Sequence, residues 1–157
     1  MNTNQEKVAS TINNLWETCK DGRQGYETAA ENVDNPQLKS ELTRLAQQRA
    51  SFMSELQSSA SQVGVTPPQT DTTLGGTVME AAGAVHRGWI NLKSVVTGHD
   101  NKAILSECEN GDTAAIKAYE AAMQDTSIPA SVKSLIEKQH HEIQAAKQKI
   151  TALKQSI

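Results

Sequence analysis

Residues 33–36, Val-Asp-Asn-Pro, separate two long amphipathic segments, and this short break decides the fold. Asn35 is suited to accept hydrogen bonds from the free amides at a helix start. Pro36 is tolerated in the first helical turn, where its missing N–H has no partner to lose. A connection this short leaves room only for an antiparallel helical hairpin. The sequence therefore predicts two adjacent helices, over residues 3–33 and 36–63.

Both segments carry inward residues at intervals of three and four positions, which is the pattern of a helix with one buried face. Gly64 follows the second stripe and is expected to end that helix in the left-handed conformation. The first stripe consists of Val8, Ile12, Leu15, Trp16, Cys19, Tyr26, Ala29, Ala30 and Val33. The second consists of Leu38, Leu42, Leu45, Arg49, Phe52, Leu56 and Val63.

The rest of the chain repeats this design after a longer connection. Turn residues predict an exposed loop over 65–76, and apolar spacing predicts a short helix over 78–96. Asp100 is placed to cap a third long helix over 101–124, which stops before Ser127-Ile128-Pro129. A fourth helix, with Val132 as its first inward residue, reaches the C-terminus. Four helices of similar length, with a tight hairpin at each end and a long crossover between, predict a single domain over 1–157. Its fold class is an all-α, ferritin-like up-down-down-up four-helix bundle with a short extra helix in the crossover.

Composition narrows the classes of function. The chain has 15 Lys+Arg and 18 Asp+Glu, a net charge of -3, so general affinity for nucleic acid or membranes is not expected. The chain has only two Trp, two Tyr and one Phe. This scarcity favours helices over a sheet, because strands are rich in aromatic residues. No signal peptide or membrane-spanning run is evident, and Cys19 and Cys108 are expected to be free thiols. We therefore expect a cytoplasmic protein.

Several segments together resemble an uncharacterised bacterial family of ferritin-like four-helix bundles, a domain of unknown function. The segments are Gly25-Tyr26, Leu45 through Phe52 to Glu55-Leu56, His86-Arg87-Gly88-Trp89-Ile90-Asn91-Leu92-Lys93 with Thr97-Gly98, and Cys108-Glu109-Asn110-Gly111-Asp112 with Ala118-Tyr119. The resemblance implies a ferritin-like fold and no established reaction. It also implies a departure, because the last helix of the family often has a histidine where this chain has Lys147.

A ferritin-like fold raises the hypothesis of a di-iron centre, which needs inward Glu residues and a Glu-x-x-His on each of two helices. The chain has one such match, Glu137 and His140, on the last helix, and His141 could join Glu137 in holding an adventitious surface metal. The second helix contains no histidine. Arg49 stands at an inward position where a cation would repel metal. We therefore expect no cofactor, with iron or another divalent metal as the alternative.

The hairpin geometry instead predicts a buried polar layer at mid-bundle. Folding at residue 35 brings Cys19 level with Arg49, and folding near residue 127 brings Cys108 and Asp112 level with Gln144. A buried guanidinium needs a carboxylate, and the candidates for this role are Asp112, Glu109 and Asp21. We therefore expect a salt bridge from Arg49 to one of these three carboxylates, flanked by Gln144. Gly22 and Gly111 are expected to permit close helix approach or to provide room for a large neighbour such as Arg49.

The crossover segment contains His86, Arg87 and Trp89, which form a candidate interaction surface. Trp89 either fills the core or anchors a partner protein, and the rarity of aromatic residues favours the core. A homodimer through this helix and a neighbouring bundle face is the expected assembly.

Two classes of function remain. The first is a non-catalytic helical bundle that acts through contacts with an unidentified protein partner, in a stress-related or accessory role by analogy with ferritin-like relatives. The second is a ferritin-like metal-binding protein or di-iron oxidoreductase. The missing ligand spacing favours the first class and argues against an enzyme.

Overall fold

The computed structural model describes residues 3–68, 89, 92 and 100–157. Within these residues the chain forms four α-helices and no strand: α1 (Thr3–Asn32), α2 (Pro36–Gln62), α5 (Asn101–Met123) and α6 (Ala130–Gln155). These bounds agree with the four predicted long helices to within one or two residues at each end. Of the predicted crossover helix over 78–96, Trp89 and Leu92 are described, whereas His86, Arg87 and the other residues lie outside the described part of the chain.

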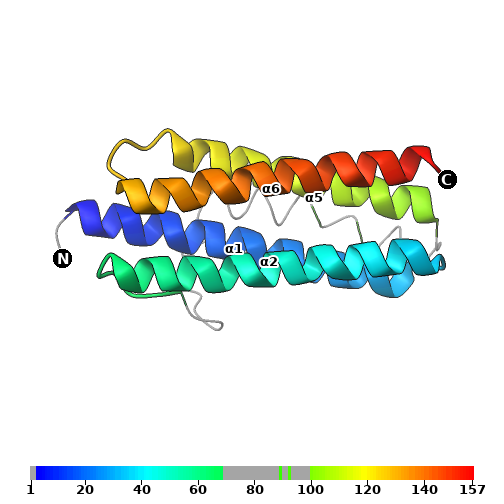
Figure 1. Cartoon of the computed structure of the whole chain (residues 1–157), viewed down its shortest axis with the longest axis horizontal. Helices are drawn as coiled ribbons and strands as arrows, with labels where there is room; N and C mark the ends of the chain where they lie inside the picture. Colours follow the sequence, from blue (N-terminus) through cyan, green and yellow to red (C-terminus); the bar gives the residue numbers. More distant parts are fainter. Residues whose placement is uncertain (1–2, 69–88, 90–91, 93–99) are drawn as a thin grey trace.

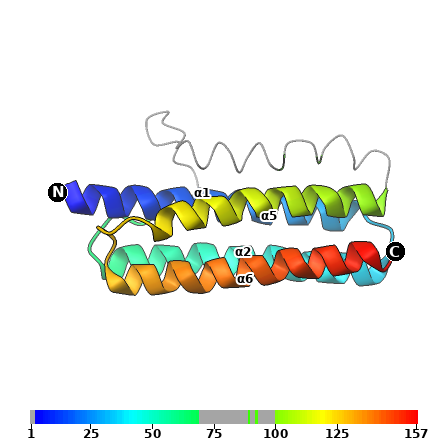
Figure 2. The ribbon, with the colours of Figure 1, turned by 90° about the horizontal axis from the view of Figure 1, so that it is seen from above.

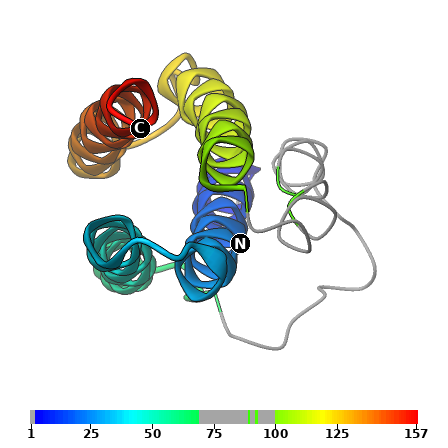
Figure 3. The same cartoon turned by 90° about the vertical axis from the view of Figure 1, so that its right-hand side faces the viewer.

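The four helices lie along one another as a bundle (Figure 1). α1 and α6 run in one direction, whereas α2 and α5 run in the opposite direction (Figures 1 and 2). Seen from one end, α1 lies beside α2 and α5, and α6 lies beside α5 and α2 (Figure 3). α1 and α6 are therefore diagonal to each other, as are α2 and α5, and the core lies between the four helices.

Caps fix the helix boundaries as the sequence predicted. The Asn35 side chain accepts hydrogen bonds from the backbone amides of Gln37 (2.8 Å) and Leu38 (3.2 Å). At the start of α5 the Asp100 side chain likewise accepts hydrogen bonds from the backbone amides of Lys102 (3.0 Å) and Ala103 (3.3 Å). Gly64 has a φ of 78°, the left-handed conformation that ends a helix without a Cβ clash. These local signals set the lengths of the elements.

The connection after α2 corrects one prediction. Residues 65–76 were predicted to be an exposed loop, but Val65 is 4% exposed and packs into the core. Gln57 also donates a hydrogen bond to the Pro68 carbonyl (2.8 Å), which holds the segment against α2. An apolar side chain beside a helix end can bury itself even where turn residues dominate the sequence. Residues 69–76 lie outside the described part of the chain.

Side chains from all four helices build a continuous core. Of the helices in 3–68 and 100–157, none carries an apolar stretch of the length needed to cross a lipid bilayer. Most core residues are aliphatic, but Arg49, Asp112 and Gln139 are also completely or almost completely buried. Buried groups of this kind must satisfy one another, because water is excluded. They define the candidate site.

Candidate functional site

Arg49 on α2 and Asp112 on α5 form a buried ion pair. The Nη1 atom of Arg49 donates to Oδ1 of Asp112 at 2.9 Å, and the side chains are 1% and 0% exposed. The second carboxylate oxygen, Oδ2, accepts from the hydroxyl of Tyr26 on α1 at 2.5 Å. Charge-assisted hydrogen bonds of this kind are stronger than neutral ones. We name Arg49, Asp112 and Tyr26 the Arg49 cluster, and it joins three of the four helices.

Further contacts hold the guanidinium of Arg49 in place. Its Nε atom donates to the Gln48 side chain at 3.2 Å. Its Cζ atom lies 5.2 Å from the centroid of the Tyr26 ring, within the range of a cation–π interaction. Within the described residues, its Nη2 atom has no hydrogen-bond partner. The Gln48 side chain and the Tyr26 ring thus position the guanidinium, and the Asp112 carboxylate compensates its charge.

Two members of the Arg49 cluster, Arg49 and Tyr26, have raised pKa values. Burial alone would lower the pKa of Arg49, but the neighbouring Asp112 carboxylate and the Tyr26 hydroxyl raise it above its ordinary value. Burial, followed by the charge of Asp112, raises the pKa of Tyr26 well above its ordinary value. The layer therefore keeps a guanidinium cation and a neutral phenol throughout the physiological pH range.

The two predicted glycines make room for different neighbours. A Cβ atom added to Gly22 would lie 3.1 Å from Nη1 and 3.5 Å from Cγ of Arg49, so this glycine gives space to the guanidinium as predicted. A Cβ atom added to Gly111 would instead overlap the indole ring of Trp89. Gly111 thus gives room to a large neighbour as predicted, but that neighbour is Trp89 and not Arg49. The rotation of α5 about its own axis turns that face toward Trp89.

A second chain of hydrogen bonds crosses the core beside the first. The hydroxyl of Tyr119 donates to Oε1 of Gln139 at 2.7 Å, and the Gln139 amide donates to Oε1 of Glu55 at 3.0 Å and to the Phe52 carbonyl at 3.3 Å. The Sγ atom of Cys19 lies 3.0 Å from the Tyr119 hydroxyl oxygen. Because that hydroxyl has a single hydrogen, the thiol of Cys19 is the donor in this contact. We name Cys19, Tyr119, Gln139 and Glu55 the Gln139 cluster.

Gln139 replaces Gln144 as the glutamine of the buried layer. Gln144 was predicted to flank the Arg49 pair, but it is only half-buried, whereas Gln139 is 0% exposed. The sequence did contain a signal, because Gln139 stands at an inward position of the apolar stripe of the last helix. Tyr26 was also predicted to point inward, without any polar role. A buried tyrosine usually needs a hydrogen-bond partner for its hydroxyl group. Tyr26 finds this partner in the Arg49 cluster, and Tyr119 finds it in the Gln139 cluster.

Cys19 and Cys108 are free, buried thiols. Burial raises the pKa of Cys19 to about 11, and it raises the pKa of Cys108 well above its ordinary value. Since the thiolate is the nucleophile, neither sulfur is activated for chemistry at neutral pH.

Glu109 is not the partner of Arg49 in this arrangement. Its carboxylate accepts from Nζ of Lys154 and from the hydroxyl of Thr151, both at 2.5 Å. Burial alone would raise the pKa of Glu109, but the hydrogen bonds from Lys154 and Thr151 lower it below its ordinary value. We name Glu109, Thr151 and Lys154 the Glu109 cluster. Asp21, the third predicted candidate, is half-buried on α1.

Trp89 lies in the core rather than on an interaction surface. Its side chain is 7% exposed, and its ring centroid lies 5.2 Å from that of Tyr26. The core alternative of the sequence prediction therefore describes Trp89, and the partner-anchor alternative does not.

The residues considered as weak metal ligands do not come together at mid-bundle. Glu137 and His141 are exposed, and Nε2 of the half-buried His140 lies 3.4 Å from the Glu120 carboxylate. Residues 3–68, 89, 92 and 100–157 contain no group of three or more His, Cys, Asp or Glu side chains that could hold a metal ion. In the Arg49 cluster, both oxygens of Asp112 already accept hydrogen bonds beside a cation. This arrangement does not fit a di-iron pair.

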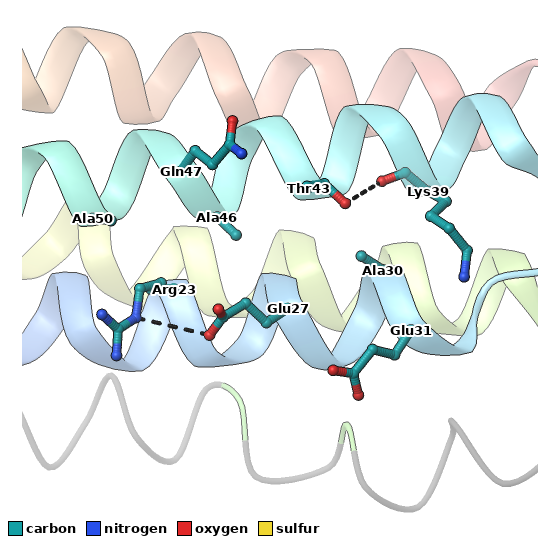
Figure 4. Close-up of a pocket in the computed structure, with 9 residues that line it drawn as sticks. All are labelled: Arg23, Glu27, Ala30, Glu31, Lys39, Thr43, Ala46, Gln47 and Ala50. Carbon is teal, nitrogen blue, oxygen red and sulfur yellow. Dashed lines mark hydrogen bonds and ion pairs between the residues drawn. The ribbon is translucent and has the colours of Figure 1, made fainter.

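A shallow groove opens between α1 and α2 on the outside of the bundle (Figure 4). Its volume is about 330 Å³, and Arg23 and Glu27 of α1 form an ion pair of 3.7 Å along one wall. The lining residues are Arg23, Glu27, Ala30, Glu31, Lys39, Thr43, Ala46, Gln47 and Ala50. Two cations and two anions balance one another there, so the groove has no net charge with which to select an ionic ligand.

The helices and the two internal hydrogen-bonded clusters define the class of protein: a four-helix bundle whose centre is held by an ion pair. The family described as a domain of unknown function (DUF2383) matches residues 7–125, and the chain belongs to that family. The matched residues include nearly all of α1 and the whole of α2 and α5, and α6 completes the bundle. No curated protein matches the chain.

Proposed function

We propose that this protein is a non-catalytic, ferritin-like helical bundle that acts in the cytoplasm through contacts with other protein surfaces. The Arg49 cluster carries the proposal, because it places a compensated cation where a metal-dependent bundle needs converging carboxylates and imidazoles. The parallel course of α2 and α5 supports the ferritin-like part (Figures 1 and 2), since that order requires one long crossover.

The physical argument rests on charge. A metal pair at mid-bundle would lie close to the guanidinium of Arg49, and repulsion between cations is strong where water is excluded. A metal bound by Asp112 would draw charge from the carboxylate that compensates Arg49 and accepts from Tyr26, and so weaken both hydrogen bonds. The geometry therefore favours a structural role for the layer.

Metal analysis tests this part of the proposal. The protein is purified after expression in medium supplemented with iron and manganese, and its metal content is measured by elemental analysis. We expect substoichiometric metal, and any trace should disappear in the double variant His140→Ala/His141→Ala if it is bound at the surface. Two metals per chain, retained in that variant, would overturn the non-catalytic assignment in favour of a metal-binding protein or di-iron oxidoreductase.

We further propose that the protein forms a homodimer, with the α1–α2 groove in the interface. The supporting observations are the small side chains of Ala46 and Ala50, which permit close approach of another helix, and the balanced charges of the walls (Figure 4). An interface related by a two-fold axis must complement itself, and a groove with both signs of charge can do so.

Sedimentation at micromolar concentration tests the homodimer. We expect a mass of two chains for the unaltered protein and of one chain for Ala50→Glu, which adds a carboxylate within the groove. Ala145→Glu is the matched control, because Ala145 is exposed on α6 and does not line the groove; it should remain dimeric. A single-chain mass for the unaltered protein would remove the homodimer without affecting the metal conclusion.

A further inference from the structure

A second groove lies between the last turns of α2 and the first turns of α6. The green end of α2 and the orange start of α6 lie at the same end of the bundle (Figures 1 and 2). The groove has a volume of about 380 Å³, within the range of about 300–1,000 Å³ that small-molecule sites occupy. Six polar residues line it: Ser54, Glu55, Ser58, Ser59, Gln62 and Ser131. We name it the serine groove.

Ser59 brings a buried hydroxyl group to this groove. It is 8% exposed, and within the described part of the chain its hydroxyl makes no hydrogen bond. A serine or threonine inside a helix can bond the carbonyl four residues back, as Thr43 bonds Lys39, but Ser59 does not. The other buried polar residues among those described all have hydrogen-bonded side chains: Thr18, Arg49, Asp112 and Gln139. The Ser59 hydroxyl thus keeps an unused donor at the groove.

The start of α6 places backbone donors beside the same groove. Its N-cap residue is Pro129, which supplies no side-chain hydrogen bond, whereas Asn35 and Asp100 cap α2 and α5. The first amides of a helix have no partner inside the helix, and the helix dipole gives this end a partial positive charge. Ser131, the second residue of α6, lines the groove. Unsatisfied amides therefore lie close to the Ser59 hydroxyl.

One carboxylate, Glu55, also lines the groove, but its contacts reduce its effect on an anion. Its Oε1 atom accepts from the Gln139 amide at 3.0 Å, and its Oε2 atom accepts from Nζ of Lys138 at 3.3 Å. The ammonium group of Lys138 thus compensates the negative charge of Glu55. The groove is close to neutral and is surrounded by hydroxyl, amide and backbone N–H donors.

We propose that the serine groove binds an oxyanion of the phosphate class, held by the Ser59 and Ser131 hydroxyls and by the first amides of α6. Helix N-termini bind such anions because free amides and the helix dipole both favour negative oxygen atoms. An oxyanion also gives the buried Ser59 hydroxyl the acceptor that the protein does not supply. The shared chemistry is the tetrahedral oxyanion, whether it is a free ion or the phosphate group of a small molecule. This site is independent of the protein contacts proposed above.

An NMR titration of the isotope-labelled full chain with inorganic phosphate tests the site, with sodium chloride keeping the ionic strength constant. We expect saturable shifts of the amides of residues 58–62 and 130–132. Ser59→Ala should weaken phosphate binding by about tenfold, because the lost hydrogen bond goes to a charged acceptor. Its folding is not in question, since alanine is the better helix former. Equal affinity of Ser59→Ala and the unaltered chain would overturn the proposal.

Ser134→Ala is the matched control, because Ser134 is exposed on α6 and does not line the groove. It should bind phosphate as the unaltered chain does. Loss of binding in this variant as well would show that the effect of Ser59→Ala is not specific to the groove. Shifts that do not saturate, or that chloride reproduces, would show an adventitious ion only and would overturn the site.

A gain of affinity provides an independent test, because partial unfolding does not produce one. Glu55→Gln should tighten phosphate binding by about threefold or more, since it removes a like charge and releases Lys138 from its ion pair. Unchanged or weaker binding in Glu55→Gln would place the phosphate outside the groove.

Glycerol 3-phosphate, titrated in parallel with inorganic phosphate, distinguishes the two sources of the oxyanion. Tighter binding of the ester favours an organic phosphate, tighter binding of the ion favours free phosphate, and either ranking supports an oxyanion site. Glycerol itself should not shift the same amides. If glycerol bound as well as its phosphate ester, the oxyanion would not be the group that is recognised.

Discussion

α5 carries two carboxylates three residues apart, and the structure gives them contrasting environments. Asp112 pairs with Arg49 where the two side chains are 0% and 1% exposed. Glu109 pairs with Lys154 where they are 16% and 31% exposed. The first pair joins α2 and α5 across the diagonal of the bundle at 2.9 Å, and the second joins the neighbouring helices α5 and α6 at 2.5 Å. We therefore expect burial, more than the chemistry of the pair, to set how much stability is lost when each pair is broken.

The two environments follow from helix geometry. Residues three apart on a helix differ by about 60° around its axis, so Asp112 can point into the bundle while Glu109 points toward its edge. The longer Glu109 side chain then reaches Thr151 and Lys154 near the end of α6. The shorter Asp112 side chain meets Arg49 and Tyr26 instead.

The largest expected effect comes from breaking the buried pair. Asp112→Ala should lower the free energy of unfolding by about 3–5 kcal/mol, because it leaves the Arg49 cation buried without a carboxylate. Urea denaturation at pH 7 measures this loss. The double variant Arg49→Met/Asp112→Ala should recover much of it, since no charge then remains in the core. If the double variant were as unstable as the sum of the single variants, the pair would not be coupled as described.

The next largest effect is expected at alkaline pH, which should lower the free energy of unfolding. The pKa of Cys19 is raised from its ordinary value of 9.0 to about 11. The folded state thus holds its proton more tightly than the unfolded state. Stability from this group is fully present below pH 9 and is lost as pH rises toward 11, by about 2–3 kcal/mol.

Cys19→Ala provides the control for this alkaline effect. Tyr26, Tyr119 and Cys108 also have raised pKa values and remain in the variant, so it should still lose stability above pH 9. It should do so with a shallower slope than the unaltered chain. Identical pH profiles from urea denaturation would contradict the burial of an un-ionised thiol at this position.

Gly22→Ala should produce a smaller effect, because two contributions oppose each other. Alanine in place of glycine inside a helix adds about 1 kcal/mol of stability, but the new Cβ atom would lie 3.1 Å from Nη1 of Arg49. Asp112 restrains the guanidinium, so we expect a net change below about 1 kcal/mol. In an Arg49→Met background the clash is relieved, and thermal unfolding should show clear stabilisation. A stabilisation of the same size in both backgrounds would mean that Gly22 does not contact the guanidinium.

The smallest effect is expected at the Glu109 cluster. Lys154→Met should cost less than about 1 kcal/mol at pH 7, because a partly exposed ion pair is weakened by solvent and by salt. The lowered pKa of Glu109 means that its contribution is present above the ordinary value of 4.5 and is lost as pH falls below it. Glu109→Gln should remove this acid-side loss and leave the alkaline profile unchanged. A loss comparable to that of Asp112→Ala would erase the distinction between the two pairs.

Much of this arrangement follows from the sequence because its signals are local. Asn35, Pro36, Gly64 and Asp100 act within a few residues, and the structure has the caps and the left-handed stop at these positions. The inward positions follow from a repeat of 3.6 residues per turn, which is a property of each helix alone. The burial of Arg49 beside Gly22 was predicted from the length of the first hairpin, because two tightly connected helices have little freedom to slide.

The partners across the bundle were less predictable. Gln144 was chosen because hairpin counting places it level with Asp112, yet Gln139 is the buried glutamine. Three carboxylates were compatible with Arg49, and counting along the chain does not distinguish them. The polar roles of Tyr26 and Tyr119 were not predicted, because their rings fit an apolar stripe and only their hydroxyl groups need partners.

By itself, the sequence determined the four helices, their ends, the tight first hairpin and the residues that point inward, because periodicity and capping act over one or two turns. Only the tertiary structure decided that Asp112 rather than Glu109 neutralises Arg49, and that Gly111 accommodates Trp89. These outcomes depend on how each helix is rotated about its axis relative to its neighbours. A rotation of about 60° exchanges one carboxylate for the other, and only the packing of the whole core fixes that angle.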